Sequence, residues 1–315
     1  MKHDTAVYAN RLVKQYKNGV LALDGLSLEV EKGTIFSLLG KNGAGKSTLI
    51  KILTTFLSPT SGDAALLGKS LPEHAKEIRP QIACAAQNVS IDPYLSFMDN
   101  MIFQSRMYKI SKEDAKERIH MLTAAFELDS YLKYPVSTYS GGIKRRLDLA
   151  LSLISNPQIL FLDEPTAGMD PASRIALWNM IQKIRAEFKT TIFLTTHYLE
   201  EADQLSDRIC IIREGKSVIQ GTPFELKTYL RQNLLKIRFS DNDQACRCKT
   251  ALSELLVPDR IQIQNNTLLL DSSDCKSDLE KAGRFLLDHK IPFLGIEIAQ
   301  PTLEDVFLRL TGEAA

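Results

Sequence analysis

The chain has 315 residues, enough for one α/β core and a smaller domain, because single cores rarely grow beyond about 250–300 residues. Its composition, 44% hydrophobic and 24% charged, is that of an ordinary soluble protein. The 39 basic and 38 acidic residues give a formal net charge of +1, which argues against a nucleic-acid partner, since nucleic-acid binders favour a basic excess.

No stretch of the sequence approaches the ~20 consecutive apolar residues that cross a bilayer, and the first residues lack the apolar segment of a secretory signal. The 5 cysteines show no disulfide framework. Cys246 and Cys248 form a C-x-C pair, but no second cysteine pair or histidine cluster lies near them, which argues against a metal site. We therefore expect a protein that is made and kept in the cytosol.

Residues 1–222 predict an α/β domain. The first thirty or so residues alternate apolar and polar, and this pattern predicts antiparallel strands. From residue 34 onwards, short apolar strands alternate with helices, which implies a mainly parallel sheet covered on both faces. Residues 93–155 have a mostly helical pattern, with an N-cap expected at Ser111, and predict an inserted helical subdomain.

The composition changes after residues 221–223, and residues 223–315 predict a second, smaller domain. Its expected order is strand, helix, two strands, helix and strand, followed by a last helix from Pro301. This βαββαβ order is typical of ferredoxin-like α+β domains. We expect it to be an accessory or regulatory domain.

The strongest chemical signal is a glycine-rich segment, residues 40–48, placed between a predicted strand and a predicted helix; it is a full Walker A sequence. Its glycines let backbone N–H groups turn inward around phosphate oxygens, and the helix N-terminus adds a positive field. Lys46 can reach the β- and γ-phosphates, and the Ser47 hydroxyl can bind Mg²⁺. The alternative, a glycine turn without a ligand, does not explain the strand–helix context. The candidate nucleotide-binding residues here are Gly40, Asn42, Gly43, Ala44, Gly45, Lys46, Ser47 and Thr48.

Two adjacent acids, Asp163 and Glu164, follow the apolar run Ile-Leu-Phe-Leu. Ligands of open α/β sheets bind at the carboxyl ends of the strands, where these acids are expected. Asp163 is placed to hold Mg²⁺ through water, and Glu164 to polarise the attacking water as a general base. By itself the pair could equally be a helix cap or a surface feature; beside a Walker A sequence it indicates catalysis.

A second candidate for phosphate binding is the segment Ser140, Gly141 and Gly142, just before the strand that leads to the two acids. A serine followed by two glycines at a helix start offers another N-terminus with free N–H groups. The alternative is a capped amphipathic helix with a solvated basic face.

These motifs resemble, in order and spacing, those of the ATP-binding-cassette (ABC) ATPases. The series is completed by Gln87 after a predicted strand, by the segment AGMD that ends at Asp170, and by His197 after another strand. The resemblance covers about residues 5–222. It implies a P-loop NTPase fold, with a RecA-like mainly parallel sheet, an N-terminal antiparallel β subdomain and an inserted helical subdomain.

The resemblance also implies residue roles. Tyr16 is similar to the aromatic residue that stacks on adenine, although an ordinary strand tyrosine is the alternative. Gln87 is similar to the glutamine that senses Mg²⁺ or the lytic water and relays to a membrane partner. Asp170 is similar to the aspartate that crosses a dimer interface, and His197 to the histidine that contacts the γ-phosphate. An isolated histidine would more often be structural.

In this family, Ser140 to Gly142 of one copy would cover the ATP held by another copy, so the chain is expected to act as a head-to-tail homodimer or heterodimer with ATP and Mg²⁺ as cofactors. ATP binding would close the pair, and hydrolysis would let it open. Two positions depart from the family pattern: Lys41 stands for the usual proline and Tyr139 for the usual leucine. Neither change removes a phosphate donor, so both sites are expected to remain competent.

The segment PTLEDVFL, residues 301–308, resembles the closing motif of the daunorubicin-resistance type of exporter ATPase, which pairs with a separate ABC-2-type permease. The resemblance implies an exporter motor at the cytoplasmic face of the membrane, with the apolar-rich residues 93–108 as a candidate dock for the permease. The alternative for that segment is the core of the helical subdomain. The alternative function is a non-transport cassette ATPase that acts on a soluble partner such as the ribosome.

Overall fold

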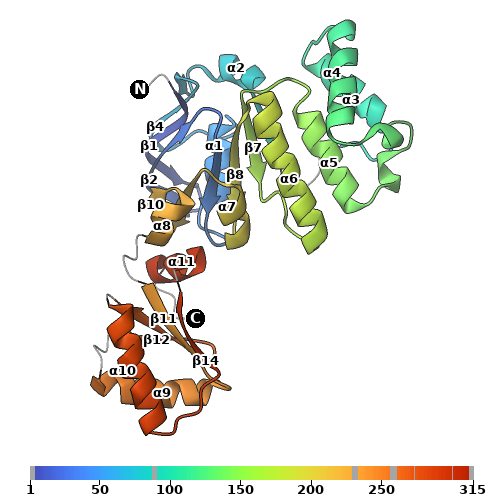
Figure 1. The fold of residues 1–315 in the computed structure, drawn as a ribbon. Coiled ribbons are helices and arrows are strands. Elements are labelled where there is room, and N and C mark those ends of the chain that lie inside the picture. Colours follow the sequence, from blue (N-terminus) through green and yellow to red (C-terminus); the bar gives the residue numbers. More distant parts are fainter. Residues whose placement is uncertain are drawn as a thin grey trace. The chain divides into compact units, whose positions relative to one another are not determined.

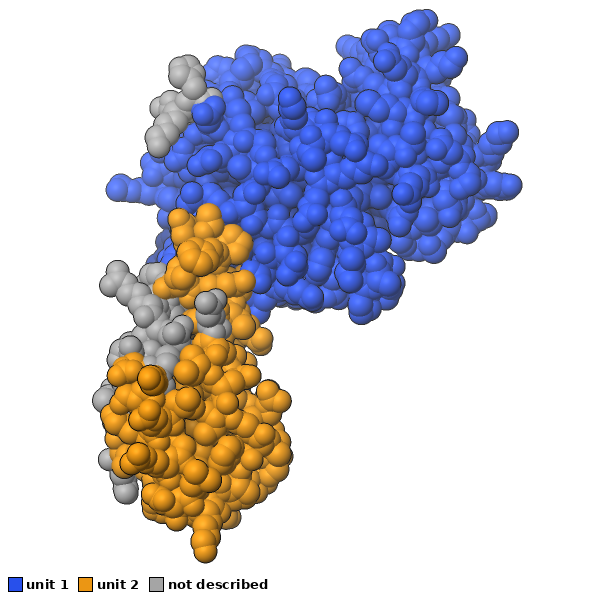
Figure 2. Space-filling model, in the orientation of Figure 1, with its two compact units in different colours: residues 1–220 blue, residues 221–315 orange. Residues whose placement is uncertain are grey.

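The computed structural model forms two compact units, residues 1–220 and residues 221–315, shown in different colours in Figure 2. The structure describes residues 4–86, 91–228, 233–255, 261–272, 274–299 and 301–311. The first unit has two hydrophobic cores and the second unit has one.

The first unit begins with an antiparallel sheet, as the alternating sequence predicts. The strand order is β2-β1-β4-β5, and β1 pairs with both β2 and β4. Along β2, Leu26, Leu28 and Val30 are buried while the residues between them are exposed, which is the period of two that places one face on a core. The strands are β1 (Thr5–Gln15), β2 (Leu21–Glu31), β4 (Ser61–Leu66) and β5 (Lys69–Leu71).

A second sheet, with strand order β10-β9-β3-β8-β7-β6, forms the centre of this unit (Figure 1). The neighbours from β9 to β6 pair in parallel. In β7, Ile159 and Phe161 belong to one hydrophobic core while Leu160 and Leu162 belong to the other, so the strand is covered on both faces. The strands are β3 (Ile35–Leu39), β6 (Ile82–Ala85), β7 (Ile159–Asp163), β8 (Thr191–Thr196), β9 (Arg208–Arg213) and β10 (Lys216–Gly221).

Helices accompany this sheet, and three of them form the predicted helical insertion. The side chain of Ser111 accepts a hydrogen bond from the backbone N–H of Asp114 at 3.1 Å, so the expected N-cap is confirmed. The side chains of Phe97, Met101 and Phe126, on the apolar side of the insertion, are buried in a hydrophobic core. The insertion contains α3 (Phe97–Met107), α4 (Lys112–Ala125) and α5 (Gly141–Ser152). The other helices are α1 (Lys46–Leu53), α2 (Ala75–Ile78), α6 (Pro171–Phe188) and α7 (Leu199–Leu205).

The second unit has the expected βαββαβ order around an antiparallel sheet, β12-β13-β11-β14. Leu235, Ile237 and Phe239 of the β11 region pack with residues of α9 and α10 in one core. The ferredoxin-like prediction is therefore confirmed. The elements are β11 (Asn233–Arg238), α9 (Asn242–Leu255), β12 (Ile261–Gln264), β13 (Thr267–Ser272), α10 (Cys275–Asp288) and β14 (Gly295–Ala299). Two further helices, α8 (Pro223–Thr228) and α11 (Leu303–Thr311), contact each other.

None of the helices in the described ranges is both long enough and apolar enough to cross a membrane.

Candidate nucleotide-binding site

The glycine-rich segment forms a tight loop between β3 and α1. Gly43 and Gly45 have φ values of +84° and +105°, in the left-handed region that favours glycine. A Cβ atom on Gly45 would lie 2.5 Å from the backbone oxygen of Ala22, so no larger residue fits there. The loop leads directly into Lys46, the first residue of α1, which is the strand–loop–helix arrangement that cradles phosphates.

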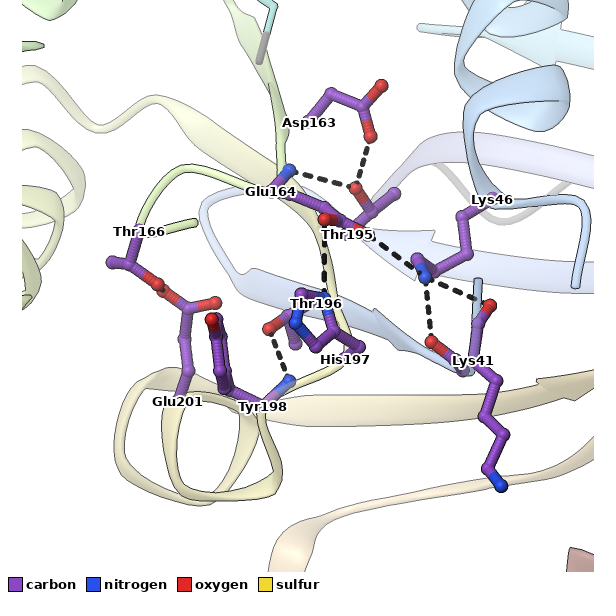
Figure 3. Close-up of polar contacts among 11 residues, drawn as sticks. Lys41, Lys46, Asp163, Glu164, Thr166, Thr195, Thr196, His197, Tyr198 and Glu201 are labelled. Atoms are coloured by element: carbon purple, nitrogen blue, oxygen red, sulfur yellow. Dashed lines mark hydrogen bonds and ion pairs between the residues drawn. The ribbon is translucent and has the colours of Figure 1, made fainter. Parts of the chain in front are cut away.

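Lys46 is the buried cation of this loop, with only 5% of its side chain exposed. Its ammonium group donates hydrogen bonds to the backbone oxygens of Gly40 at 2.7 Å and Lys41 at 3.1 Å. The same nitrogen lies 3.1 Å from Oε1 of Glu164, as Figure 3 shows. The structure therefore brings the lysine of the glycine-rich loop against the carboxylate predicted to be the general base.

Asp163 and Glu164 lie at the carboxyl end of β7, where the sequence predicted them. The hydroxyl of Thr195, on the neighbouring strand β8, donates to Oδ1 of Asp163 at 2.6 Å. The backbone N–H of Glu164 is directed at Thr195, with its carbonyl and hydroxyl oxygens both 3.1 Å away. Glu164 has a φ of +47°, so the chain turns sharply here. These contacts fix the two acids at the edge of the sheet (Figure 3).

His197 follows β8 and faces the other oxygen of the same carboxylate. Its Nδ1 lies 3.2 Å from Oε2 of Glu164, but the ring nitrogen makes no well-aligned hydrogen bond. The side chain is 32% exposed, against 14% for Glu164. Glu164 thus lies between a buried lysine and a half-exposed histidine, with one carboxylate oxygen toward each.

Tyr16 lies next to the first turn of α1. Its hydroxyl oxygen is 3.2 Å from Oγ1 of Thr48, and the Lys14 ammonium lies 5.8 Å from the centre of its ring. The ring is half-buried. This position beside the glycine-rich loop is compatible with stacking on a base, and that role remains a prediction.

Ser140 and Asp170 both occupy helix N-caps. The Ser140 hydroxyl accepts from the backbone N–H of Ile143 at 3.5 Å at the start of α5, and Asp170 accepts from that of Ser173 at 3.0 Å at the start of α6. Hydrogen bonds from Ser173 lower the pKa of Asp170. A Cβ atom on Gly142 would lie 3.6 Å from the Ser173 hydroxyl, so the two helix starts are neighbours. Their roles toward a second copy remain predictions.

The two departures from the family pattern differ in what they do. The Tyr139 hydroxyl donates to the backbone oxygen of Tyr134 at 2.9 Å and also to that of Tyr131, and its ring packs edge-on against the Tyr131 ring. Tyr139 therefore braces the segment before α5. In Figure 3 the side chain of Lys41 extends away from the ammonium group of Lys46.

Gln87 lies outside the described residues, so its predicted role is neither supported nor opposed by the structure. The sequence analysis missed three residues that contact the loops of the site: Thr195, described above, Arg145 and Glu201. Arg145 is buried rather than part of a solvated basic face. Glu201 is fully buried in α7 and accepts hydrogen bonds from Thr166 and Trp178. The sequence around Arg145 has the pattern of an exposed basic helix face and gave no signal that this side chain is buried.

A parallel sheet with a phosphate-binding loop, a buried lysine and paired acids at its carboxyl edge defines a P-loop ATPase. The family model described as "ABC transporter" matches residues 23–167. The chain belongs to the ABC transporter family, and it is an ATPase of that family.

Relatives and solved structures agree with this family. The daunorubicin/doxorubicin resistance ATP-binding protein DrrA of Streptomyces peucetius is 37% identical over 311 residues, which cover 98% of this chain and 93% of the relative. The Nod factor export ATP-binding protein I of Sinorhizobium fredii is 35% identical over 99% of this chain and 87% of its own length. Among solved structures, cbiO1 of Clostridium perfringens, part of the ABC transporter complex cbiONQ, is 26% identical with a TM-score of 0.67, over 72% of this chain and 94% of that one.

Proposed function

We propose that the protein is the ATP-hydrolysing motor of an ABC exporter, acting at the cytoplasmic face of the membrane on a separate ABC-2-type permease. The observation that carries the proposal is the position of the Glu164 carboxylate, which lies between Lys46 of the glycine-rich loop and His197. Full-length similarity to ATP-binding proteins of drug resistance and Nod factor export supports the exporter class.

In this proposal ATP binds along the glycine-rich loop, with its phosphates toward Lys46 and its adenine against Tyr16. Mg²⁺ fits the donors at hand, because the Ser47 hydroxyl and the Asp163 carboxylate offer the hard oxygen ligands that this ion prefers. When bound, Mg²⁺ would neutralise developing charge on the phosphates. Glu164 acts as the general base for the attacking water, and His197 contacts the γ-phosphate from the exposed side of the site.

Two cassettes, identical or different, complete each other's sites. Ser140 to Gly142 of one copy offer the N-terminus of α5 to the phosphates held by the other, and Asp170 lies at the interface beside them. Gln87 relays the state of the site to the permease. Because ATP joins the two surfaces, its binding closes the pair and its hydrolysis opens it. The smaller domain, residues 223–315, steadies or regulates the pair.

The permease docks on the helical insertion. Between α3 and α4 lies a cavity of ≈ 390 Å³, lined by apolar side chains, here called the floor, and by charged side chains with a net positive charge, here called the rim. An amphipathic cytoplasmic helix with acidic flanking residues suits both the floor and the rim. Nearby, Tyr94, Phe103 and Met107 expose large apolar surfaces. The floor includes Met98, Ile102, Ile119 and Leu132, and the rim has three cations, Arg106, Lys112 and Lys116, and one acid, Asp129.

Co-purification from membranes in mild detergent, followed by mass spectrometry, tests the proposal. Recovery of a polytopic membrane protein in an ATPase-active complex is the expected result. An Ile102→Glu variant, which places a charge on the apolar floor, should keep its basal ATPase activity and lose that partner. Recovery of ribosomes instead, or of no membrane protein from either form, would overturn the exporter proposal.

A further inference from the structure

Arg145 is a buried cation in α5 to which the proposed function assigns no role. Its side chain is only 4% exposed. A buried charge is costly unless hydrogen-bonded and paired, so its partners indicate what it does.

The guanidinium group donates three hydrogen bonds, one to a carboxylate of its own helix and two to backbone oxygens of other segments. Nη1 donates to the backbone oxygen of Ala86 at 2.6 Å and to Oδ2 of Asp148 at 3.0 Å. Nε donates to the backbone oxygen of Pro165 at 3.2 Å. Asp148 lies one turn further along the same helix and balances the charge. The other two acceptors belong to loops that follow β6 and β7 and are far apart in the sequence.

The two carbonyl groups adjoin residues of the proposed catalytic machinery. Ala86 immediately precedes Gln87, and Pro165 immediately follows Glu164. A charge-assisted hydrogen bond to a backbone carbonyl oxygen restrains the orientation of the peptide plane that contains it. The residues joined by that peptide bond are restrained with it. The planar guanidinium reaches the two carbonyls through two separate nitrogens in a fixed geometry, Nε and Nη1, whereas a lysine ammonium would have to reach both from a single atom.

We propose that Arg145 is a positioning residue for ATP hydrolysis, which ties the helix that begins after Ser140 to the backbone beside Glu164. A shift of α5 would then move both loops together. The inference rests on the proposed role of Glu164 as general base. The competing explanation is that Arg145 and Asp148 only stabilise the helical insertion.

The test is steady-state ATPase kinetics of the full chain carrying Arg145→Lys. We expect kcat to fall about tenfold or more, because small misplacements of catalytic groups have large effects on the rate. The KM and the Kd for ATP should stay within about twofold. The matched control is Arg118→Lys: Arg118 of α4 also donates to a backbone oxygen, that of Ile154 at 3.0 Å, but touches neither loop. This control should keep its kcat.

A double variant separates positioning from general stabilisation. If Arg145 acts through Glu164, adding Arg145→Lys to Glu164→Gln should lower the residual kcat little further, since the two residues form one functional unit. An unchanged kcat in Arg145→Lys, a matching loss of ATP affinity, or two losses that multiply in full would overturn the proposal. Brisk hydrolysis by Glu164→Gln alone would instead refute the role of Glu164.

If Arg145→Lys does not fold, as judged by its circular dichroism and melting curve, the kcat and ATP affinity of Asp148→Asn test the proposal instead. That variant keeps Arg145 and weakens the salt bridge between its Nη1 and the Asp148 carboxylate, the printed contact that orients Nη1. We expect a severalfold lower kcat with unchanged ATP affinity. A folded Asp148→Asn protein with a normal kcat would then overturn the proposal.

Discussion

The carboxylate of Glu164 lies 3.1 Å from the ammonium nitrogen of Lys46. The two residues come from different strand ends, one after β7 and one after β3, and meet because both strands run in parallel and end at the same edge of the sheet. The residue proposed to activate water and the residue proposed to hold phosphate are therefore neighbours, and substitutions can separate their contributions.

Glu164→Gln should lower the ATPase kcat by about 10²–10⁴-fold, the range typical for loss of a positioned general base. The amide keeps the size of the side chain, so ATP affinity should change little, and an ATP-dependent dimer should accumulate. Light scattering after gel filtration with ATP measures the dimer. A suitable control is Glu214→Gln, because Glu214 also has a positive φ, of 50°, but its carboxylate is exposed. A variant at Glu164 that hydrolyses ATP at the normal rate would exclude this residue as the base.

Lys46→Met should weaken ATP binding by about 10- to 100-fold, because a hydrogen bond to a charged group contributes ~1.5–3 kcal/mol. Methionine preserves the unbranched side chain and removes the charge. Titration with a fluorescent ATP analogue gives the two dissociation constants. Lys51→Met, on the exposed side of the same helix, should bind ATP like the unmodified protein. Equal affinities for both variants would contradict the proposed phosphate contact.

Glu201→Gln should stabilise the protein in a pH-dependent way. Burial raises the pKa of Glu201, so the folded protein binds this proton more tightly than the unfolded chain does. Its contribution to stability is therefore fully present below the ordinary carboxyl pKa and is lost as the pH rises through the raised value. Glutamine keeps an oxygen that can accept from Thr166 and Trp178 and does not ionise.

We expect similar unfolding free energies for the two proteins near pH 5 and a higher unfolding free energy for Glu201→Gln near pH 8. Urea denaturation at both pH values measures the difference. Its counterpart, Glu200→Gln, changes the exposed carboxylate of the preceding residue and should show no such pH dependence. A gain that is equal at both pH values would mean that ionisation of Glu201 is not the cause.

Deletion of residues 224–315 should leave a folded protein that binds ATP. The residues around Lys46 all belong to the first unit, and the two hydrophobic clusters of that unit contain no residue beyond 220. Circular dichroism and nucleotide titration of the shortened chain test this. Complete loss of binding by a folded product would mean that the smaller domain contributes to the nucleotide site.

The sequence was sufficient for those parts of the site that depend on local order along the chain. Gly45 and Lys46 could be placed because a phosphate-binding loop needs glycines and a helix start in a fixed sequence. The burial pattern of β2 and the cap at Ser111 likewise follow from the side chains of adjacent residues. The βαββαβ order of the second unit was predicted for the same reason.

Contacts between distant segments could not be predicted in this way. The basic run that contains Arg145 has the pattern of an exposed helix face, and only its packing against the ends of β6 and β7 shows that this side chain is buried. Thr195 was one of several polar residues at the end of an apolar strand. Its contact with Asp163 depends on the pairing of β7 with β8, which the sequence pattern leaves open.

Strand β3 precedes the proposed phosphate-binding loop and lies between β8 and β9 in the sheet. In the sequence, both of these neighbours come after β3 by more than half the length of the first unit. During synthesis the apolar strand β3 therefore leaves the ribosome long before either neighbour exists. Such non-local pairing is slow to form and leaves apolar surface exposed meanwhile. The segment proposed to bind nucleotide is among the first to be made, yet it can become a binding site only after most of the cassette has been translated.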